Sequence, residues 1–170
     1  MGHQHGFSLL ELLCVLAILS ILAYVGSAQF LTVSQNTQDK NALKTEMKRL
    51  SDALIQARQL AVVSGQTSFL CGGEHCDGHW SSGFTLYQAV PFGGLDKVYR
   101  HIVFDDLLNV SWRGFPSQKK QIEFHSNGLS GYQNGTFEFC LGAWQTDLVL
   151  NQSGRFYTSD PKAKSAEACL

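Results

Sequence analysis

The chain has 170 residues, with 13 lysines and arginines, 14 aspartates and glutamates, and a formal net charge of -1. This length suits one modest domain beside an apolar N-terminal stretch. The balanced charge excludes a strongly basic nucleic-acid-binding chain and an acidic disordered tail as overall classes. The sequence has no phosphate loop, no Gly-x-Ser-x-Gly elbow and no His-Glu-x-x-His motif, so we expect no enzymatic activity, cofactor or metal.

An apolar stretch from Phe7 to Val25 follows a short polar leader. It has roughly the 20-residue length that a membrane-spanning helix needs. Glu11 is its only side chain expected to carry a charge, and a carboxylate at bilayer depth costs about 2.5–3.5 kcal/mol unless it has a partner. A secretory signal peptide cut near residues 26–28 and a plain membrane anchor are the alternatives. Against the signal peptide, the leader lacks lysine and arginine, and an acid in the apolar core is unusual.

The helical pattern continues beyond this stretch. Apolar residues recur every three or four positions in residues 43–61, and charged residues fall largely off this stripe. Gly65 is a suitable C-terminal stop. The spacing therefore predicts one long helix over about residues 8–64, whose second half packs against a sheet. Two helices separated near residues 35–37 are the alternative.

After Gly65 the pattern changes to a period of two, interrupted by turn residues. We expect turns at residues 91–94, at Asn127-Gly128 and at Asn134-Gly135. The fold class is accordingly α+β, with a long N-terminal helix packed on an antiparallel, meander-like β-sheet head. Its predicted strands are Thr67–Cys71, Gly83–Tyr87, Val98–Phe104, Asn109–Trp112, Gln121–His125, Thr136–Leu141 and Asp147–Asn151.

Four cysteines lie outside the apolar stretch, an even number that indicates two disulfides in an exported head. Proximity favours Cys71 with Cys76, which leaves Cys140 with Cys169, although the sequence leaves other pairings open. The loop after Cys71 also holds two histidines, and two thiols with two imidazoles are a ligand set that zinc accepts. The spacing is not a standard one for zinc, and we expect a disulfide there.

The N-terminus resembles a prepilin processing site. Residues 6–11, Gly-Phe-Ser-Leu-Leu-Glu, are similar to the motif of type IV pilins and type II secretion pseudopilins. The resemblance implies that a prepilin peptidase cuts after Gly6 and that the new amine of Phe7 is methylated. It also places the family's glutamate at Glu11. The leader departs from the family by carrying histidines in place of lysine or arginine, and Ala28 stands where many major pilins have proline.

The new amine offers a counter-ion for the buried acid. A free α-amino group has a pKa near ~7.7–8, so it is largely protonated at neutral pH. We expect Glu11 to pair with the Phe7 ammonium of a neighbouring subunit. One such pair per subunit fixes the axial register of a helical filament, and the penalty for the unpaired charge in lipid then favours assembly.

Further motifs, in order and spacing, resemble the FimT/GspH family of minor pilins and pseudopilins. They are ARQLAV at 57–62, WSSGF at 80–84, IEFHSNG at 122–128 and LVLNQSGR at 148–155. A cysteine at 140 and another near the terminus at 169, on either side of the Gly-Arg strand, resemble FimU-like minor pilins. The resemblance implies a type IV pilin fold and a structural role in the tip or priming complex for pilus assembly.

The same resemblance implies a domain organisation. Residues 1–6 are the leader, 7–28 a transmembrane or filament-core helix segment, and 29–65 the soluble half of the helix. Residues 66–170 are an antiparallel β head with a disulfide-closed C-terminal tail. The expected partners are the prepilin peptidase, other minor and major pilins, and the bacterial inner membrane. The head is expected in the periplasm before the subunit enters the pilus.

Two other functions stay open within the family. One is a GspH-like minor pseudopilin of type II secretion, and the other is a DNA-binding minor pilin for DNA uptake in natural transformation. FimT-type DNA receptors carry Gly-Arg-x-Arg near the C-terminus, and here Tyr157 replaces the second arginine. An aromatic in a strand is more often buried, so we expect Tyr157 in the core, and stacking on a base is the alternative. The candidate phosphate contacts are Arg155, Lys162, Lys164, Arg113, Lys119 and Lys120.

Overall fold

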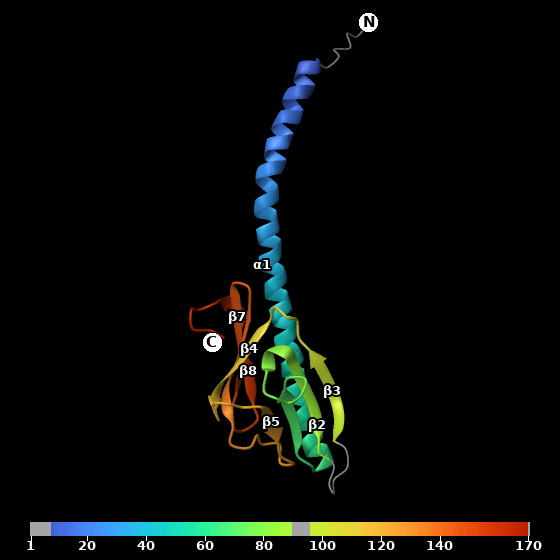
Figure 1. Ribbon diagram of the computed structural model, residues 1–170, viewed down its shortest axis with the longest axis vertical. Coiled ribbons are helices and arrows are strands. Elements are labelled where there is room, and N and C mark those ends of the chain that lie inside the picture. Colours follow the sequence, from blue (N-terminus) through green and yellow to red (C-terminus); the bar gives the residue numbers. More distant parts are fainter. Residues whose placement is uncertain (1–7, 90–95, 170) are drawn as a thin grey trace. The chain divides into compact units, whose positions relative to one another are not determined.

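The computed structural model describes residues 8–89 and 96–169, and only the backbone of residues 25–32. Within these residues the chain forms one α-helix, one 3-10 turn and nine strands (Figure 1). The chain divides into two compact units, with the boundary between Gln38 and Asp39. The elements of the second unit form the β head.

Helix α1, Leu9–Ser64, begins at a serine cap. The hydroxyl of Ser8 accepts the N–H of Glu11 at 3.2 Å, and the carbonyl of Ser8 accepts the N–H of Leu12 at 3.2 Å. Serine followed three residues later by glutamate is the capping-box pattern, which satisfies donors that the first helical turn leaves free. The helix ends before Gly65, whose φ of +70° suits the left-handed position after a helix. One continuous helix is thus formed, and the alternative of two helices is wrong.

In the first unit, the side chains of residues 8–24 are all exposed. Within residues 8–89 and 96–169, no helical stretch reaches the combination of length and hydropathy that a membrane crossing needs. The predicted membrane or filament-core segment, residues 7–28, begins at Phe7, which lies outside the described residues. That assignment stays a prediction.

In the second unit, two antiparallel sheets form one core with the helix. The first sheet has the strand order β3-β2-β1-β5, and the second has β4-β6-β7-β8 with β9 also paired to β7. The apolar stripe of α1 predicted over residues 43–61 is buried against the inner faces of both sheets. The strands are β1 Ser68–Gly72, β2 Gly83–Gln88, β3 Lys97–Val103, β4 Asn109–Phe115, β5 Gln121–Phe124, β6 Asn134–Leu141, β7 Trp144–Leu150, β8 Phe156–Thr158 and β9 Lys162–Ala163; the 3-10 turn is Trp80–Ser82.

All seven predicted strands form, within three residues of their expected bounds, but their pairing is not a simple meander. β1 pairs with β5 as well as with β2, and β4 pairs with β6. Alternation of apolar residues locates a strand and its buried face, and it does not select the neighbour. The short strands β8 and β9 carry too few residues for the alternation to show.

Of the two described turn signals, one is confirmed and one is wrong. Gly128 has φ +77°, and its N–H donates to the carbonyl of His125 at 2.8 Å, as a turn requires. Asn134-Gly135 instead opens strand β6. A Cβ on Gly135 would lie 2.7 Å from the Cα of Gly114 and 2.6 Å from the ring of Trp112. Glycine is needed there for the close approach of two strands. Residues 91–94 lie outside the described part of the chain.

Two tryptophan side chains pack in the core against Phe137 of β6, which is fully buried. Trp112 comes from β4 of the same sheet, and Trp80 comes from the 3-10 turn. The ring of Trp80 meets Phe137 edge-on at 4.7 Å between centroids, and the ring of Trp112 lies at 4.8 Å. Each such pair adds about 0.5–1.5 kcal/mol beyond simple burial. The indole N–H of Trp80 donates to the carbonyl of Lys119 at 2.8 Å, so its polar edge is satisfied too.

We predict that Phe137→Ala lowers the free energy of unfolding by about 3–5 kcal/mol, because it removes a fully buried ring and leaves a cavity. Urea denaturation of the fragment 30–170 measures this loss. The control is Leu107→Ala, which truncates a side chain that is 79% exposed and is expected to change stability by about 0.5 kcal/mol or less. Equal losses in the two variants would contradict the central position of Phe137.

Candidate functional site: the N-terminal helix and the C-terminal network

The predicted processing residues Gly6 and Phe7 lie outside the described residues. Glu11 lies in the first turn of α1, where its side chain is exposed. A negative charge in the first turn interacts favourably with the positive end of the helix dipole. No ion pair of Glu11 forms with any residue that the structure describes. The carboxylate is therefore compatible with helix capping and is accessible to a partner.

The four cysteines of the head form two disulfides, Cys71–Cys76 and Cys140–Cys169, with Cα atoms 5.0 and 6.3 Å apart. This is the pairing that proximity in the sequence favours. The first closes a five-residue loop after β1. The second joins β6 to the end of the C-terminal tail, 29 residues further along the chain. Cys14, in the apolar part of α1, is free and exposed.

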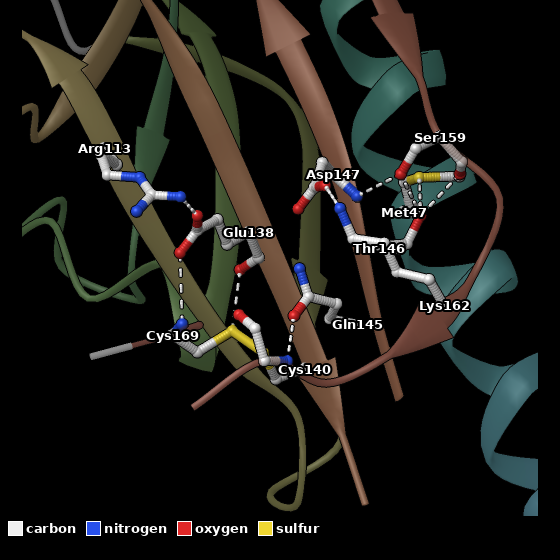
Figure 2. A network of polar contacts seen from close by, with 11 residues as sticks. Met47, Arg113, Glu138, Cys140, Gln145, Thr146, Asp147, Ser159, Lys162 and Cys169 are labelled. Atoms are coloured by element: carbon white, nitrogen blue, oxygen red, sulfur yellow. Dashed lines mark hydrogen bonds and ion pairs between the residues drawn. A yellow bond between two sulfur atoms is a disulfide. The ribbon is translucent and has the colours of Figure 1, made fainter. Parts of the chain in front are cut away.

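A buried carboxylate lies beside the second disulfide on β6 (Figure 2). Glu138 is 3% exposed, and it accepts hydrogen bonds from the guanidinium of Arg113 on β4 and from the backbone N–H of Cys169 at 3.2 Å. A buried charge is costly unless it is paired and hydrogen-bonded, and here the C-terminal tail supplies one of the donors. We call Arg113, Glu138, Cys140 and Cys169 the C-terminal network.

The next part of the tail is held on the edge of β7 (Figure 2). The ammonium of Lys162 on β9 lies 2.7 Å from the carboxylate of Asp147. The hydroxyl of Thr146 donates to the carbonyl of Ser159 at 2.6 Å, and the N–H of Asp147 donates to the hydroxyl of Ser159 at 2.9 Å. These bonds fix the chain between β8 and β9 against the sheet.

The predicted DNA contacts are distributed over several elements. Arg113 and Lys162 have carboxylate partners, which reduces their availability to phosphate. Lys119 and Lys120 follow β4 near the Cys71–Cys76 loop, where the N–H of Gly72 donates to the carbonyl of Lys120. Arg155 precedes β8, and Lys164 lies in the tail after β9. DNA binding stays a prediction.

Tyr157 was expected in the core, and this expectation is wrong. Tyr157 is 66% exposed on β8, while its neighbour Phe156 is half-buried. β8 is a three-residue strand at the edge of the second sheet, and only its inner face packs towards the helix. Tyr157 projects from the opposite face of β8 to Phe156, and its side chain is exposed there.

The loop closed by Cys71–Cys76 does not assemble a metal site from the side chains described. No group of three or more histidines, cysteines or acids with a metal-binding arrangement occurs in residues 8–89 and 96–169. Both thiols are consumed by the disulfide. The backbone N–H of His79 donates to Asp77 at 2.9 Å, and this bond is the main reason that the pKa of Asp77 is lowered.

Comparison with protein-family models settles the family. A model described as type II transport protein GspH matches residues 46–154. The chain belongs to the GspH family. A second model, the prokaryotic N-terminal methylation motif, matches residues 1–23. The family resemblance of the motifs at 57–62, 80–84, 122–128 and 148–155 is thereby confirmed.

Solved structures show the same fold. The type IV minor pilin FimU of Pseudomonas aeruginosa is 20% identical in one crystal form, covering 75% of this chain and 99% of that chain with a TM-score of 0.59. A second form gives 19% identity, 81% and 99% coverage, and a TM-score of 0.60. The minor pseudopilin EpsH from the type 2 secretion system of Vibrio cholerae is 13% identical, covers 69% and 95%, and has a TM-score of 0.54. Comparison with curated proteins gives no match.

These comparisons confirm the pilin fold, a long N-terminal helix packed on antiparallel sheets. Sequence reasoning missed Glu138, since an acid in an alternating strand is ordinarily a solvent-facing residue. A signal was present: Glu138 lies two residues before Cys140, so both side chains project from the same face of β6. A tail bound to Cys140 must therefore pass beside that acid.

We predict that the two disulfides contribute unequally to stability. In the chain-entropy model, closing the loop from Cys140 to Cys169 contributes about 3.6 kcal/mol, and closing the short loop from Cys71 to Cys76 about 2 kcal/mol. Urea denaturation of fragment 30–170 should show the larger loss for Cys140→Ser/Cys169→Ser. A larger loss for Cys71→Ser/Cys76→Ser would show that burial of the first loop outweighs chain entropy.

Proposed function

We propose that this protein is a minor subunit of a type IV pilus, which enters the tip or priming complex through α1. Glu11 is neutralised there by the Phe7 ammonium of a neighbouring subunit. The observation that carries the proposal is the first part of α1, in which apolar side chains point outward on all sides and a single carboxylate interrupts them.

The apolar surface of this segment is the physical reason for assembly. The side chains of Leu9, Leu10, Leu16 and Leu22 are each more than half exposed. A contiguous apolar surface of this size must be covered by lipid or by other subunits. In either medium a lone carboxylate costs about 2.5–3.5 kcal/mol, so a cationic partner supplied by the neighbour stabilises the assembled state over the dispersed one.

The β head favours the role of a minor pilin over that of a plain membrane anchor. It is a compact unit with two disulfides, and its fold is similar to that of the minor pilin FimU. The proposed partners are other minor and major pilins, the prepilin peptidase that cuts after Gly6, and the inner membrane that holds the subunit before assembly. The family model and the fold of EpsH support the alternative, a GspH-like minor pseudopilin of type II secretion.

We predict that Glu11→Gln leaves the protein in the membrane at its normal level and lowers its amount in sheared pili by about tenfold or more, because the ion pair is lost in a low-dielectric environment. Glutamine keeps the shape and the capping-box hydrogen bonding, so the helix itself is preserved. Immunoblots of membrane and pilus fractions measure both quantities.

The control for Glu11→Gln is Glu74→Gln, which removes one exposed acid from the head and is expected to enter pili normally. Normal entry of Glu11→Gln into pili would overturn the proposed role of the acid. Normal piliation together with lost protein secretion, in cells that lack this chain, would favour the pseudopilus alternative.

We further predict that the mature protein begins with N-methylated phenylalanine at position 7. Mass spectrometry of the N-terminal peptide from the membrane fraction checks this directly. A mature chain that begins at Gln29 would instead identify a secreted β domain, and would remove both Glu11 and the filament role.

A further inference from the structure

A groove lies between the second half of α1 and the strand β8, both within the second unit. Two adjoining cavities of about 610 and 480 Å³ form it, and Phe156 of β8 lines both. The larger cavity has an apolar lining from the helix, including Ile55, Val62 and Val63, of which Val63 is 87% exposed. The smaller cavity extends along the helix towards Lys44.

The strand that borders the groove has a free edge. The N–H of Ser159 donates to the carbonyl of Asp147, and the N–H of Asn151 donates to the carbonyl of Arg155. In an antiparallel ladder this pattern alternates, so the backbone groups of Phe156 and Thr158 point away from β7. No hydrogen bond joins these groups to any part of the chain that the structure describes. An edge of this kind is a template for another strand.

The charges in the groove are unbalanced at one end. Lys44 pairs with Asp160 and Lys48 pairs with Asp52, each at 3.0 Å, at the end formed by the smaller cavity. The larger cavity is lined by the two arginines Arg58 and Arg155. Neither guanidinium has an ion pair or a side-chain hydrogen bond with the described residues. These two guanidiniums lie beside an apolar lining. A ligand that carries a carboxylate next to apolar groups is complementary to this arrangement.

We infer that this groove binds an extended segment of another filament subunit, which adds to the free edge of β8 as a further strand. Its backbone bonds to the outward groups of Phe156 and Thr158, and its alternate side chains cover the apolar wall of the helix. An aspartate or glutamate of the segment lies against Arg58 and Arg155. The inference deepens the proposed function and depends on it for the identity of the partner as a filament subunit.

The groove selects a polypeptide over other anions for a structural reason. A nucleic acid has phosphates for the arginines, but it has no alternating N–H and C=O groups for the strand edge and no aliphatic side chains for Val62 and Val63. A fatty acid has a carboxylate and an apolar chain, but it leaves the same backbone groups without partners. A peptide strand satisfies all three features at once, as in known cases of β-strand addition.

The experiment uses the full-length protein in detergent micelles and a phage-displayed library of random octapeptides as the probe. We expect enrichment of peptides with alternating apolar residues and an aspartate or glutamate. Binding of the best peptide should protect the amides of Phe156 and Thr158 from hydrogen exchange. Methylation of its alternate backbone nitrogens should weaken binding by about tenfold or more, because strand pairing is lost.

Two variants test the site itself. Arg58→Gln/Arg155→Gln should weaken the peptide by about tenfold or more through loss of charge-assisted hydrogen bonds. The matched control, Lys119→Gln/Lys120→Gln, removes the same charge outside the groove and should bind normally. Thr158→Pro removes one outward N–H at an edge where proline is tolerated, so it should fold and bind weakly. Unchanged binding by the arginine variant would overturn the inference.

Other outcomes identify other occupants and overturn the inference. No enriched peptide, or tighter binding of a single-stranded oligonucleotide or of dodecanoate than of any peptide, excludes the strand. An enriched sequence that matches this chain points to a second copy of it instead of a different subunit. Failure here leaves the Glu11 result intact, whereas normal peptide binding with Glu11-independent entry into pili overturns only the proposed role of Glu11.

Discussion

Burial of one apolar stripe on α1 is the interaction on which the head depends. Leu43, Leu50, Leu54 and Ala57 are within 1% of complete burial, and each sheet presents its inner face to them. The opposite face of the second sheet carries polar side chains such as Arg113 and Asp147, so this sheet buries its apolar residues on the face towards the helix. In the second unit the helix therefore provides the surface against which the core of the head is packed.

The same helix changes its physical environment along its length. In the second unit its apolar side chains are covered by the chain's own strands, and over residues 9–24 they are covered by nothing that the structure describes. The apolar side chains of the first half must therefore be covered by other molecules, as those of the second half are covered by the sheets. Under the proposed function, the covered half of the helix serves folding, and the exposed half, which contains Glu11, serves assembly.

The sequence was sufficient for features that depend on local pattern. The helix bounds followed from periodicity and from Gly65, and the major strands were found by alternation. The six predicted stripe residues are all buried, and Ala53, which the prediction omitted, is fully buried with them; the six are Leu43, Met47, Leu50, Leu54, Ala57 and Ala61. The N-terminal motif and the four later motifs also identified the family. What the sequence could not supply was set by contacts between distant residues: the pairing of β1 with β5, the two short edge strands, and the packing role of Gly135.

The candidate site shows the same division between features that the sequence predicts and features that it does not. The cysteine positions were visible, and so were the basic residues, but their partners were not. Lys162 is bound to Asp147 and Arg113 to Glu138, while Arg58 and Arg155 have no ion pair with the residues that the structure describes. Nothing in the local sequence of these residues distinguishes the two groups. The groove beside β8 could not be predicted from the sequence for a further reason. The groove lies at the edge of a sheet, and which strand forms that edge depends on how all the strands pair.

The bond between Cys140 and Cys169 also sets an order of events. Thiols stay reduced in the cytosol and are oxidised in compartments outside it, so under the proposed function the tail is locked over Glu138 only after the head has crossed the membrane. Before that, the acid has Arg113 but lacks a fixed donor from the tail. Under the proposed function, the outer face of the second sheet is therefore completed only after export.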